Sequence, residues 1–206
     1  MKAKAKKSPA RREPKQRRAR ETVEAVLDAV VRILKRNGIE GVTTNRVAEV
    51  AGISIGSVYQ YFPDKRAIFT ALHDRHVEQI ARLIESTLVQ HAAAPLDDLV
   101  GALVGALVEA HGADPELHEL LATEVPYGAG GASAFEERLR GAFRLAIASR
   151  AGKPLAPGAL NRILFVVPLM VEALAHGVVL KRPAKLSLAA AREEAVRAVR
   201  AYLRLY

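Results

Sequence analysis

Apolar residues recur at helical spacing near the start of the chain. From Val23 to Leu34 they fall at intervals that place them on a single side of a helix. Asn37 and Gly38 follow, and we expect Gly38 to supply a left-handed cap because glycine adopts that backbone without steric penalty. The pattern therefore predicts a first helix that begins near Glu21 and ends at Asn37.

Two short helices joined by a tight turn are predicted next. Side-chain hydroxyls beside an apolar position are typical helix N-caps, and glycine is typical of a tight turn. Here the caps and the turn are supplied by Thr43, Thr44, Gly52 and Ser54. The helices are expected to end near Ala51 and Tyr61, which is the pattern of a helix-turn-helix whose second helix enters the major groove of DNA.

Longer helices are predicted for the rest of the chain. Asp64 caps a helix that reaches about His91, and Ile68, Phe69 and Leu72 begin its apolar stripe. Prolines and glycines then separate five further helices, expected over 96–111, 115–123, 132–151, 157–180 and 187–205. Sustained alternation of apolar and polar residues is absent from the sequence. The predicted fold class is all-α.

The positive charge of the chain is concentrated at its N-terminus. The net charge is +9, and residues 1–20 hold ten Lys and Arg against a single acid, Glu13. The remaining residues are therefore neutral overall. We expect residues 1–19 to form a disordered basic arm that either contacts DNA phosphates or the minor groove, or serves only as a solubilising tail.

Other classes of protein and site find little support in the sequence. There is no cysteine, and no constellation typical of a catalytic centre or a cofactor site stands out, so an enzyme is not expected. The longest apolar run, 163–180, contains Pro168, Glu172 and His176, which favours a buried helix over a membrane span. With no signal peptide, the prediction is a cytoplasmic protein. His73 and His76 have a spacing compatible with a metal, but with few further ligands nearby no metal site is predicted.

The segment from Thr43 to Lys65 carries a specific motif. It contains the framework T-T-x-x-V-A-x-x-A-G-I-S-x-G-S-V-Y-x-Y-F-x-x-K, which resembles the tetracycline-repressor (TetR) family of transcriptional regulators. The resemblance implies a three-helix DNA-binding domain over residues 20–67. It also implies a larger helical domain over residues 68–206 that binds an effector and dimerises.

The resemblance assigns roles within the helix-turn-helix, where Val58 and Phe62 are expected to face inward. Groups that contact bases or the DNA backbone are expected at Thr43, Thr44, Asn45, Arg46, Ser54, Ile55, Gly56, Ser57, Tyr59, Gln60, Tyr61 and Lys65. Gln60 and Ser57 are expected to face bases, whereas Tyr59, Tyr61 and Lys65 would hold phosphates. Alternatively, the tyrosines fill a small core and Arg46 is a solvated charge.

The second domain is expected to bind a partner copy and a ligand. The resemblance implies a homodimer through the last two helices, whose stripes comprise Phe165, Leu169, Ala173, Ala195, Val199 and Tyr202; an intramolecular core explains some of these equally well. Ligand sites are mostly apolar with a few polar groups. The candidates are His118, Glu124, Tyr127, Phe165, Glu172 and His176. Glu172 and His176 either form a structural pair or meet the ligand.

These features together predict a ligand-responsive regulator of transcription. The leading hypothesis is a dimeric repressor that a small, largely apolar effector releases from a pseudo-palindromic operator on double-stranded DNA. The first alternative is a constitutive regulator or a nucleoid-type binder without a ligand. An enzyme or a basic membrane-surface protein is a further alternative, and the neutral body of the chain argues against the latter.

Overall fold

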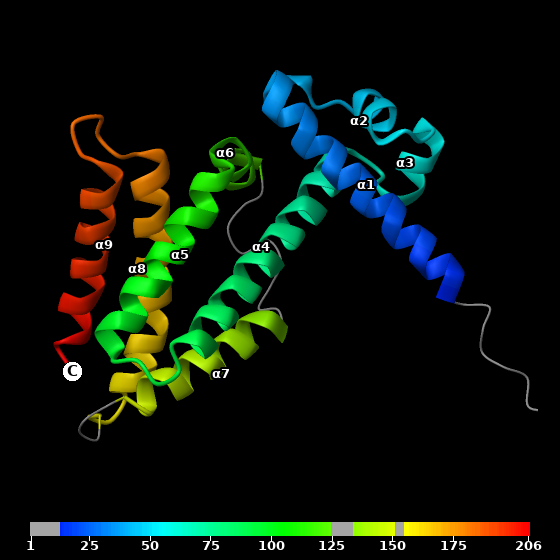
Figure 1. Cartoon of the computed structure of the whole chain (residues 1–206). Coiled ribbons are helices and arrows are strands. Elements are labelled where there is room, and N and C mark those ends of the chain that lie inside the picture. The colour runs from blue at the N-terminus through cyan, green and yellow to red at the C-terminus, as the bar shows by residue number, and fades with distance from the viewer. Residues whose placement is uncertain (1–12, 125–133, 151–154) are drawn as a thin grey trace, which may run out of the picture. The chain divides into compact units, whose positions relative to one another are not determined.

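The computed structural model describes residues 13–124, 134–150 and 155–206, and these residues form α-helices with no strand among them (Figure 1). The all-α fold class is therefore confirmed. The chain divides into two compact units, residues 1–72 and 73–206. The division lies five residues after the domain boundary expected from the sequence, within one continuous helix, α4 (Lys65–Gln90).

The first unit contains three helices and the start of α4. They are α1 (Glu13–Asn37), α2 (Thr44–Ala51) and α3 (Ile55–Tyr61), with a short 3₁₀ turn, η1 (Ile39–Gly41), after α1. α1 packs on α2, and α2 on α3. The predicted stripe of α1 is largely buried, including Val26 and Val30. The other parts of this unit also bury apolar side chains, namely Val47, Val58, Phe62, Ile68 and Phe69.

The start of α1 differs from the prediction. The helix begins at Glu13, so residues 13–19 are helical and not disordered as expected. Pro14 lies in the first turn, where its missing N–H costs no hydrogen bond. Lysine and arginine are good helix formers, and Arg17 pairs with Glu21 one turn later at 3.3 Å. Residues 1–12 of the expected arm lie outside the described residues.

The end of α1 also differs in detail. Gly38 has the expected positive φ of 65°, but its ψ of −173° is extended and not left-handed helical. The predicted left-handed cap is therefore wrong. The chain instead continues into η1, which the sequence pattern did not predict. Gly38 is the N-cap of η1, and its positive φ is a conformation that glycine adopts more readily than other residues.

The second unit is a helical bundle. It comprises most of α4 with α5 (Leu96–Ala113), α6 (Pro115–Glu124), α7 (Ala134–Ala148), α8 (Ala159–Leu180) and α9 (Leu188–Leu203). α5, α8 and α9 pack on one another and lie side by side in Figure 1. All five helices expected after residue 95 are present, with ends shifted by a few residues.

α8 supplies much of the apolar core. By length and composition it would be able to cross a membrane, but its apolar side packs on α5 and α9. The residues it buries are Ala159, Ile163, Leu164, Val167, Val171, Ala175 and Val178. α8 is thus a core helix of the second unit.

Arg150, just after α7, fixes the connection between α4 and α5. Its guanidinium donates hydrogen bonds to the backbone oxygens of His91 at 2.6 Å, Ala92 at 2.7 Å and Ala94 at 2.9 Å. Carbonyl groups at a helix end have no partner within the helix. The Arg150 guanidinium therefore provides hydrogen-bond donors for three carbonyl groups after α4, and it links the end of α7 to this turn more than 50 residues earlier in the chain.

Candidate DNA-binding face and histidine cluster

The helix-turn-helix is built by short-range hydrogen bonds. The Thr43 hydroxyl accepts from the backbone N–H of Arg46 at 3.2 Å, and the Ser54 hydroxyl accepts from that of Ser57 at 3.1 Å. Between the two helices Gly52 adopts a left-handed conformation, with φ 69° and ψ 32°. The caps predicted at Thr43 and Ser54 and the turn predicted at Gly52 are confirmed, whereas Thr44 is the first residue of α2 and not its cap.

α3 has clearly different inner and outer sides. Val58 and Phe62 are buried at 0% and 5% exposure, as expected for residues that anchor the helix. Ile55, Gly56 and Gln60 are exposed, as is Tyr59 at 52%. The interpretation of Tyr59 as a core residue is therefore wrong. We call the exposed side of α3 (Ile55, Gly56, Tyr59 and Gln60) the outer face of α3.

Two side chains of α3, Tyr59 on the outer face and Ser57 beside it, form hydrogen bonds with other side chains of the same unit. The Tyr59 hydroxyl hydrogen-bonds Thr44 Oγ1 at 3.3 Å, which orients the phenol against α2. The Ser57 side chain is partly buried and its hydroxyl bonds that of Ser54 at 2.8 Å. These contacts restrict the positions of the side chains.

The remaining predicted DNA contacts occupy varied environments. Asn45 is exposed and Tyr61 is half-buried. Arg46 pairs with Glu49 at 2.8 Å, as a solvated charge would. Lys65, the first residue of α4, has its ammonium 5.2 Å from the centre of the Phe69 ring, a cation–π contact.

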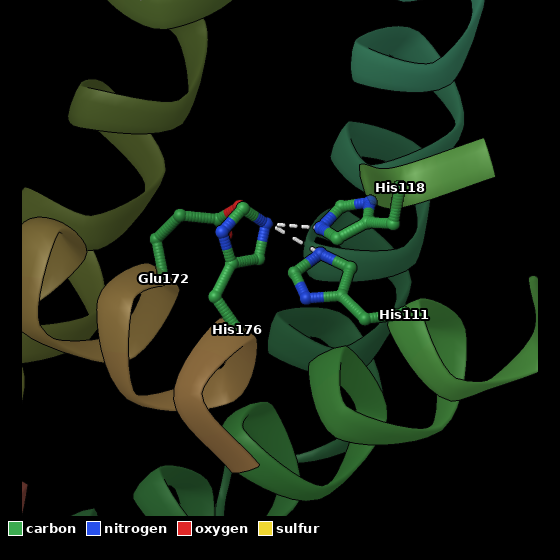
Figure 2. A group of neighbouring side chains, drawn as sticks. All are labelled: His111, His118, Glu172 and His176. Carbon is green, nitrogen blue, oxygen red and sulfur yellow. Dashed lines mark hydrogen bonds and ion pairs between the residues drawn. The ribbon is translucent and has the colours of Figure 1, made fainter. Parts of the chain in front are cut away.

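In the second unit, four polar side chains from three helices converge (Figure 2). They are His111 near the end of α5, His118 on α6, and Glu172 and His176 on successive turns of α8. We call this set the histidine cluster. Each residue offers one atom able to bind a metal ion, and these four atoms lie within 4.8 Å of one another.

Individual contacts within the histidine cluster are short. His176 Nε2 lies 3.4 Å from Glu172 Oε1, and His111 Nε2 lies 3.6 Å from the same oxygen. The Nε2 atoms of His118 and His176 form a direct hydrogen bond. The rings of His111 and His118 stack with centroids 3.8 Å apart, and the His76 ring on α4 lies edge-on to His118 at 5.0 Å.

Burial keeps these imidazoles neutral. It lowers the pKa of His76 to about 4, of His111 to about 3 and of His118 to about 2, and the mutual repulsion of the histidines adds to each shift. Burial also raises the pKa of Glu172 and lowers that of His176, which Lys181 lowers further. The cluster therefore presents neutral rings beside one carboxyl group.

The structure brings together only part of the predicted ligand set. His118, Glu172 and His176 are neighbours, and the expected pairing of Glu172 with His176 is present. Glu124 is exposed at the end of α6, and Phe165 is 70% exposed on α8. Tyr127 lies outside the described residues.

Sequence reasoning missed His111 and the proximity of His76. Four of the six histidines in the chain are in or beside the cluster. The sequence did contain one sign of this site, since His111 is a single histidine in the apolar stripe of α5. A polar side chain of this kind needs a hydrogen-bond partner when it is buried. The sequence pattern did not show which helices would surround it.

Comparison with known families now identifies the chain. The family model described as "Bacterial regulatory proteins, tetR family" matches residues 26–72, which include the whole helix-turn-helix. A second model, "Tetracyclin repressor-like, C-terminal domain", matches residues 95–203, more than half of the chain. This chain belongs to the TetR family. It is therefore a regulator of transcription with a DNA-binding helix-turn-helix, and homodimeric repressors are typical of its relatives.

Curated relatives resemble this TetR-family protein over its DNA-binding part. The nucleoid occlusion factor SlmA of Actinobacillus pleuropneumoniae serotype 5b is 39% identical over 61 residues, which cover 29% of this chain and 30% of that protein. The repressor KstR of Mycolicibacterium smegmatis is 36% identical over 61 residues, 30% of each chain. The chain thus spans about a third of the length of the curated relatives it matches, and neither relative is named as an enzyme.

Solved structures show the same fold over almost the whole chain. A TetR-family regulator from Streptomyces coelicolor has a TM-score of 0.59 at 22% identity, covering 88% of this chain and 97% of that one. The fatty acid degradation regulator FadR from Bacillus halodurans has a TM-score of 0.61 at 16% identity, covering 95% and 96%. At these identities the likeness establishes the fold alone.

Proposed function

We propose that this TetR-family protein is a dimeric cytoplasmic repressor that binds a pseudo-palindromic operator through α3 of each protomer. The outer face of α3 carries the proposal. Its small and polar residues allow a helix to approach base edges, and the buried Val58 and Phe62 hold that helix firmly. In a dimer, two such helices would meet successive major grooves.

The side chains around α3 divide naturally into two roles. Gln60 is exposed on α3 and its amide pairs well with an adenine edge, so we assign it to base reading, with Ser57 beside it. Tyr59 and Lys65 are assigned to phosphates. Lys65 begins α4, where free N–H groups and a cation together favour an anion.

Dimerisation is assigned to the exposed apolar stripe of α8. Phe165 is 70% exposed and Leu169 42%, and Ala173 is exposed one turn further along. By contrast Ala195 and Val199 of α9 are buried within the protomer, so these two belong to the intramolecular core. Tyr202 of α9 is half-buried. We assign the exposed stripe of α8 to a second copy of this chain, the kind of partner that the family favours.

An effector is assigned to the second unit, where the largely apolar core surrounds a few polar groups. That composition suits a small, largely apolar molecule. Release from DNA requires the effector to bind more tightly to a conformation with weak DNA affinity.

The central test is a pair of substitutions on selected operator DNA. Gln60→Ala should weaken operator binding by about 1–3 kcal/mol and relax the preference at one position in each half-site. Lys65→Ala should weaken binding to operator and random DNA alike. Gln90→Ala, which alters an exposed glutamine at the end of α4, is the matched control and should change neither. The proposal would be wrong if Lys65→Ala relaxed the sequence preference and Gln60→Ala left it unchanged. That result would show that α3 does not direct Gln60 toward the bases.

A second candidate function is general chromosome binding. The similarity of the DNA-binding part to a nucleoid occlusion factor favours it. Binding-site selection separates the two functions, because a nucleoid-type binder would enrich many scattered sequences, whereas a repressor would enrich one pseudo-palindrome.

A further inference from the structure

Three histidines and one glutamate in the second unit converge on a common point without a function in DNA binding. We propose that the histidine cluster is a binding site for a divalent transition-metal ion of the zinc type, with His111, His118, Glu172 and His176 as ligands. This proposal goes beyond DNA binding, because DNA binding is assigned to the first unit and the histidine cluster lies in the second.

Two of the distances within the cluster match a tetrahedral ion. Zinc binds imidazole nitrogen and carboxylate oxygen at about 2.0–2.2 Å, which sets neighbouring ligand atoms about 3.3–3.5 Å apart. The two pairs that share Glu172 Oε1 are separated by 3.4 Å and 3.6 Å. His118 and His176 also direct their Nε2 atoms at each other. A central ion would require these two Nε2 atoms to move apart to the spacing of ligands around a tetrahedral ion.

Buried nitrogen atoms without partners also point to a bound ion. Both ring nitrogens of His111, Nδ1 of His118 and Nε2 of His76 are buried without a hydrogen-bond partner among the described residues. Leaving such groups unsatisfied typically costs about 1–3 kcal/mol each. An ion at Nε2 of His111 would satisfy one of these atoms and would use the neutral form of the ring that burial favours.

The burial of the four ligands gives the site an inside and an entrance. His111 is completely buried, whereas Glu172 and His176 have side chains exposed by 38% and 32%. An ion can therefore reach the outer pair from solvent before it meets the inner pair. A site needs such an entry path as well as suitable ligands.

The donor set selects the class of metal. Three imidazoles and one carboxylate suit zinc, nickel, copper or iron, whereas magnesium and calcium prefer oxygen ligands. Since the chain has no cysteine, soft thiolate coordination is excluded. Four protein ligands also describe a closed site of the structural type more than an open catalytic one.

The test is direct metal binding by the full chain without a polyhistidine tag. Chelator-treated protein is titrated with Zn²⁺ against a competing colorimetric chelator, and one tightly bound ion per chain is expected. Co²⁺ added in its place should give the intense visible absorption of tetrahedral coordination. If the wild-type chain binds no Zn²⁺ in competition with the chelator, the proposal is wrong.

Two substitutions locate the ion, and a third serves as control. His176→Gln and Glu172→Gln each remove one ligand at a half-exposed position and should weaken Zn²⁺ binding by more than about 100-fold, since losing even an outer-sphere partner costs about 10- to 100-fold. His91→Gln alters a histidine just beyond the end of α4, about 22 Å along the helix axis from His76, and should leave binding unchanged.

Thermal unfolding gives an independent readout of the same site. Zn²⁺ should raise the Tm of the wild type and of His91→Gln, because an ion that binds only the folded state stabilises it. It should not raise the Tm of Glu172→Gln or His176→Gln, whose circular dichroism should remain that of a folded helical protein. Equal Zn²⁺ affinity in all four proteins would place the ion elsewhere and overturn the assignment.

Discussion

The exposed stripe of α8 allows a sharp test of dimerisation, through the substitution Phe165→Glu. Phe165 is 70% exposed in the protomer. A phenylalanine side chain buries about 150–250 Å² when fully enclosed, so about 140 Å² of Phe165 is available to a partner. At about 25 cal/mol per Å² this area contributes about 3.5 kcal/mol for each copy.

A two-fold interface contains the residue twice, so the upper bound on the loss is about 7 kcal/mol per dimer. Binding rarely recovers the full transfer energy of the area buried. We therefore expect a loss of about half this value, which corresponds to a rise in the dimer Kd of about 100- to 1,000-fold. The fold should be unaffected, because substitutions at exposed positions usually change stability by less than about 0.5 kcal/mol.

Sedimentation equilibrium over a range of concentrations measures this change. The wild type should sediment as a dimer of the 22.3 kDa chain at micromolar concentration, and Phe165→Glu as a monomer. Leu145→Glu is the matched control, because Leu145 on α7 is exposed to a similar extent, 73%, and should leave the dimer intact. A monomeric wild type, or a dimer that Leu145→Glu disrupts and Phe165→Glu does not, would refute the assignment of α8.

Three further predictions concern stability and the basic arm. Arg150→Ala should lower the free energy of unfolding by about 2–4 kcal/mol in urea titrations, since each charged hydrogen bond contributes about 1.5–3 kcal/mol, and Arg150→Lys should recover only part of the loss; an unchanged urea midpoint in Arg150→Ala would contradict this. In metal-free protein, the pKa values of His111 and His118 are lowered to about 3 and about 2. Below pH 6.5 these two histidines are therefore protonated in the unfolded chain but remain neutral in the folded chain. Stability should therefore be full above pH 6.5 and fall as the pH drops toward 4, by up to about 1.4 kcal/mol per pH unit for each histidine; a flat profile would show that these rings are solvated. Deleting residues 1–12, which carry six Lys and Arg, should reduce the slope of log affinity against log salt by about 0.9 for each DNA phosphate that the arm neutralises in the wild type, whereas an unmoved slope would identify the arm as a solubilising tail.

Local chemistry was sufficient to predict the helix-turn-helix. The caps of α2 and α3 act over three residues, from Thr43 to Arg46 and from Ser54 to Ser57. Gly52 turns the chain because its own backbone allows a positive φ. Such interactions depend only on residues that are close together in the chain. The sequence was therefore sufficient to predict the bounds of both helices and the inward direction of Val58 and Phe62.

Tertiary structure alone decided which apolar and polar residues meet. Phe165 and Val199 lie on similar apolar stripes in the sequence, yet one is exposed and the other is buried against neighbouring helices. His118 and His176 are 58 residues apart and meet only because α6 and α8 pack together. The period of a helix shows which residues share a side, but the neighbour on that side depends on the packing of the whole unit. For this reason the sequence determined the DNA-binding motif, whereas the histidine cluster and the exposed stripe of α8 emerged only from the fold.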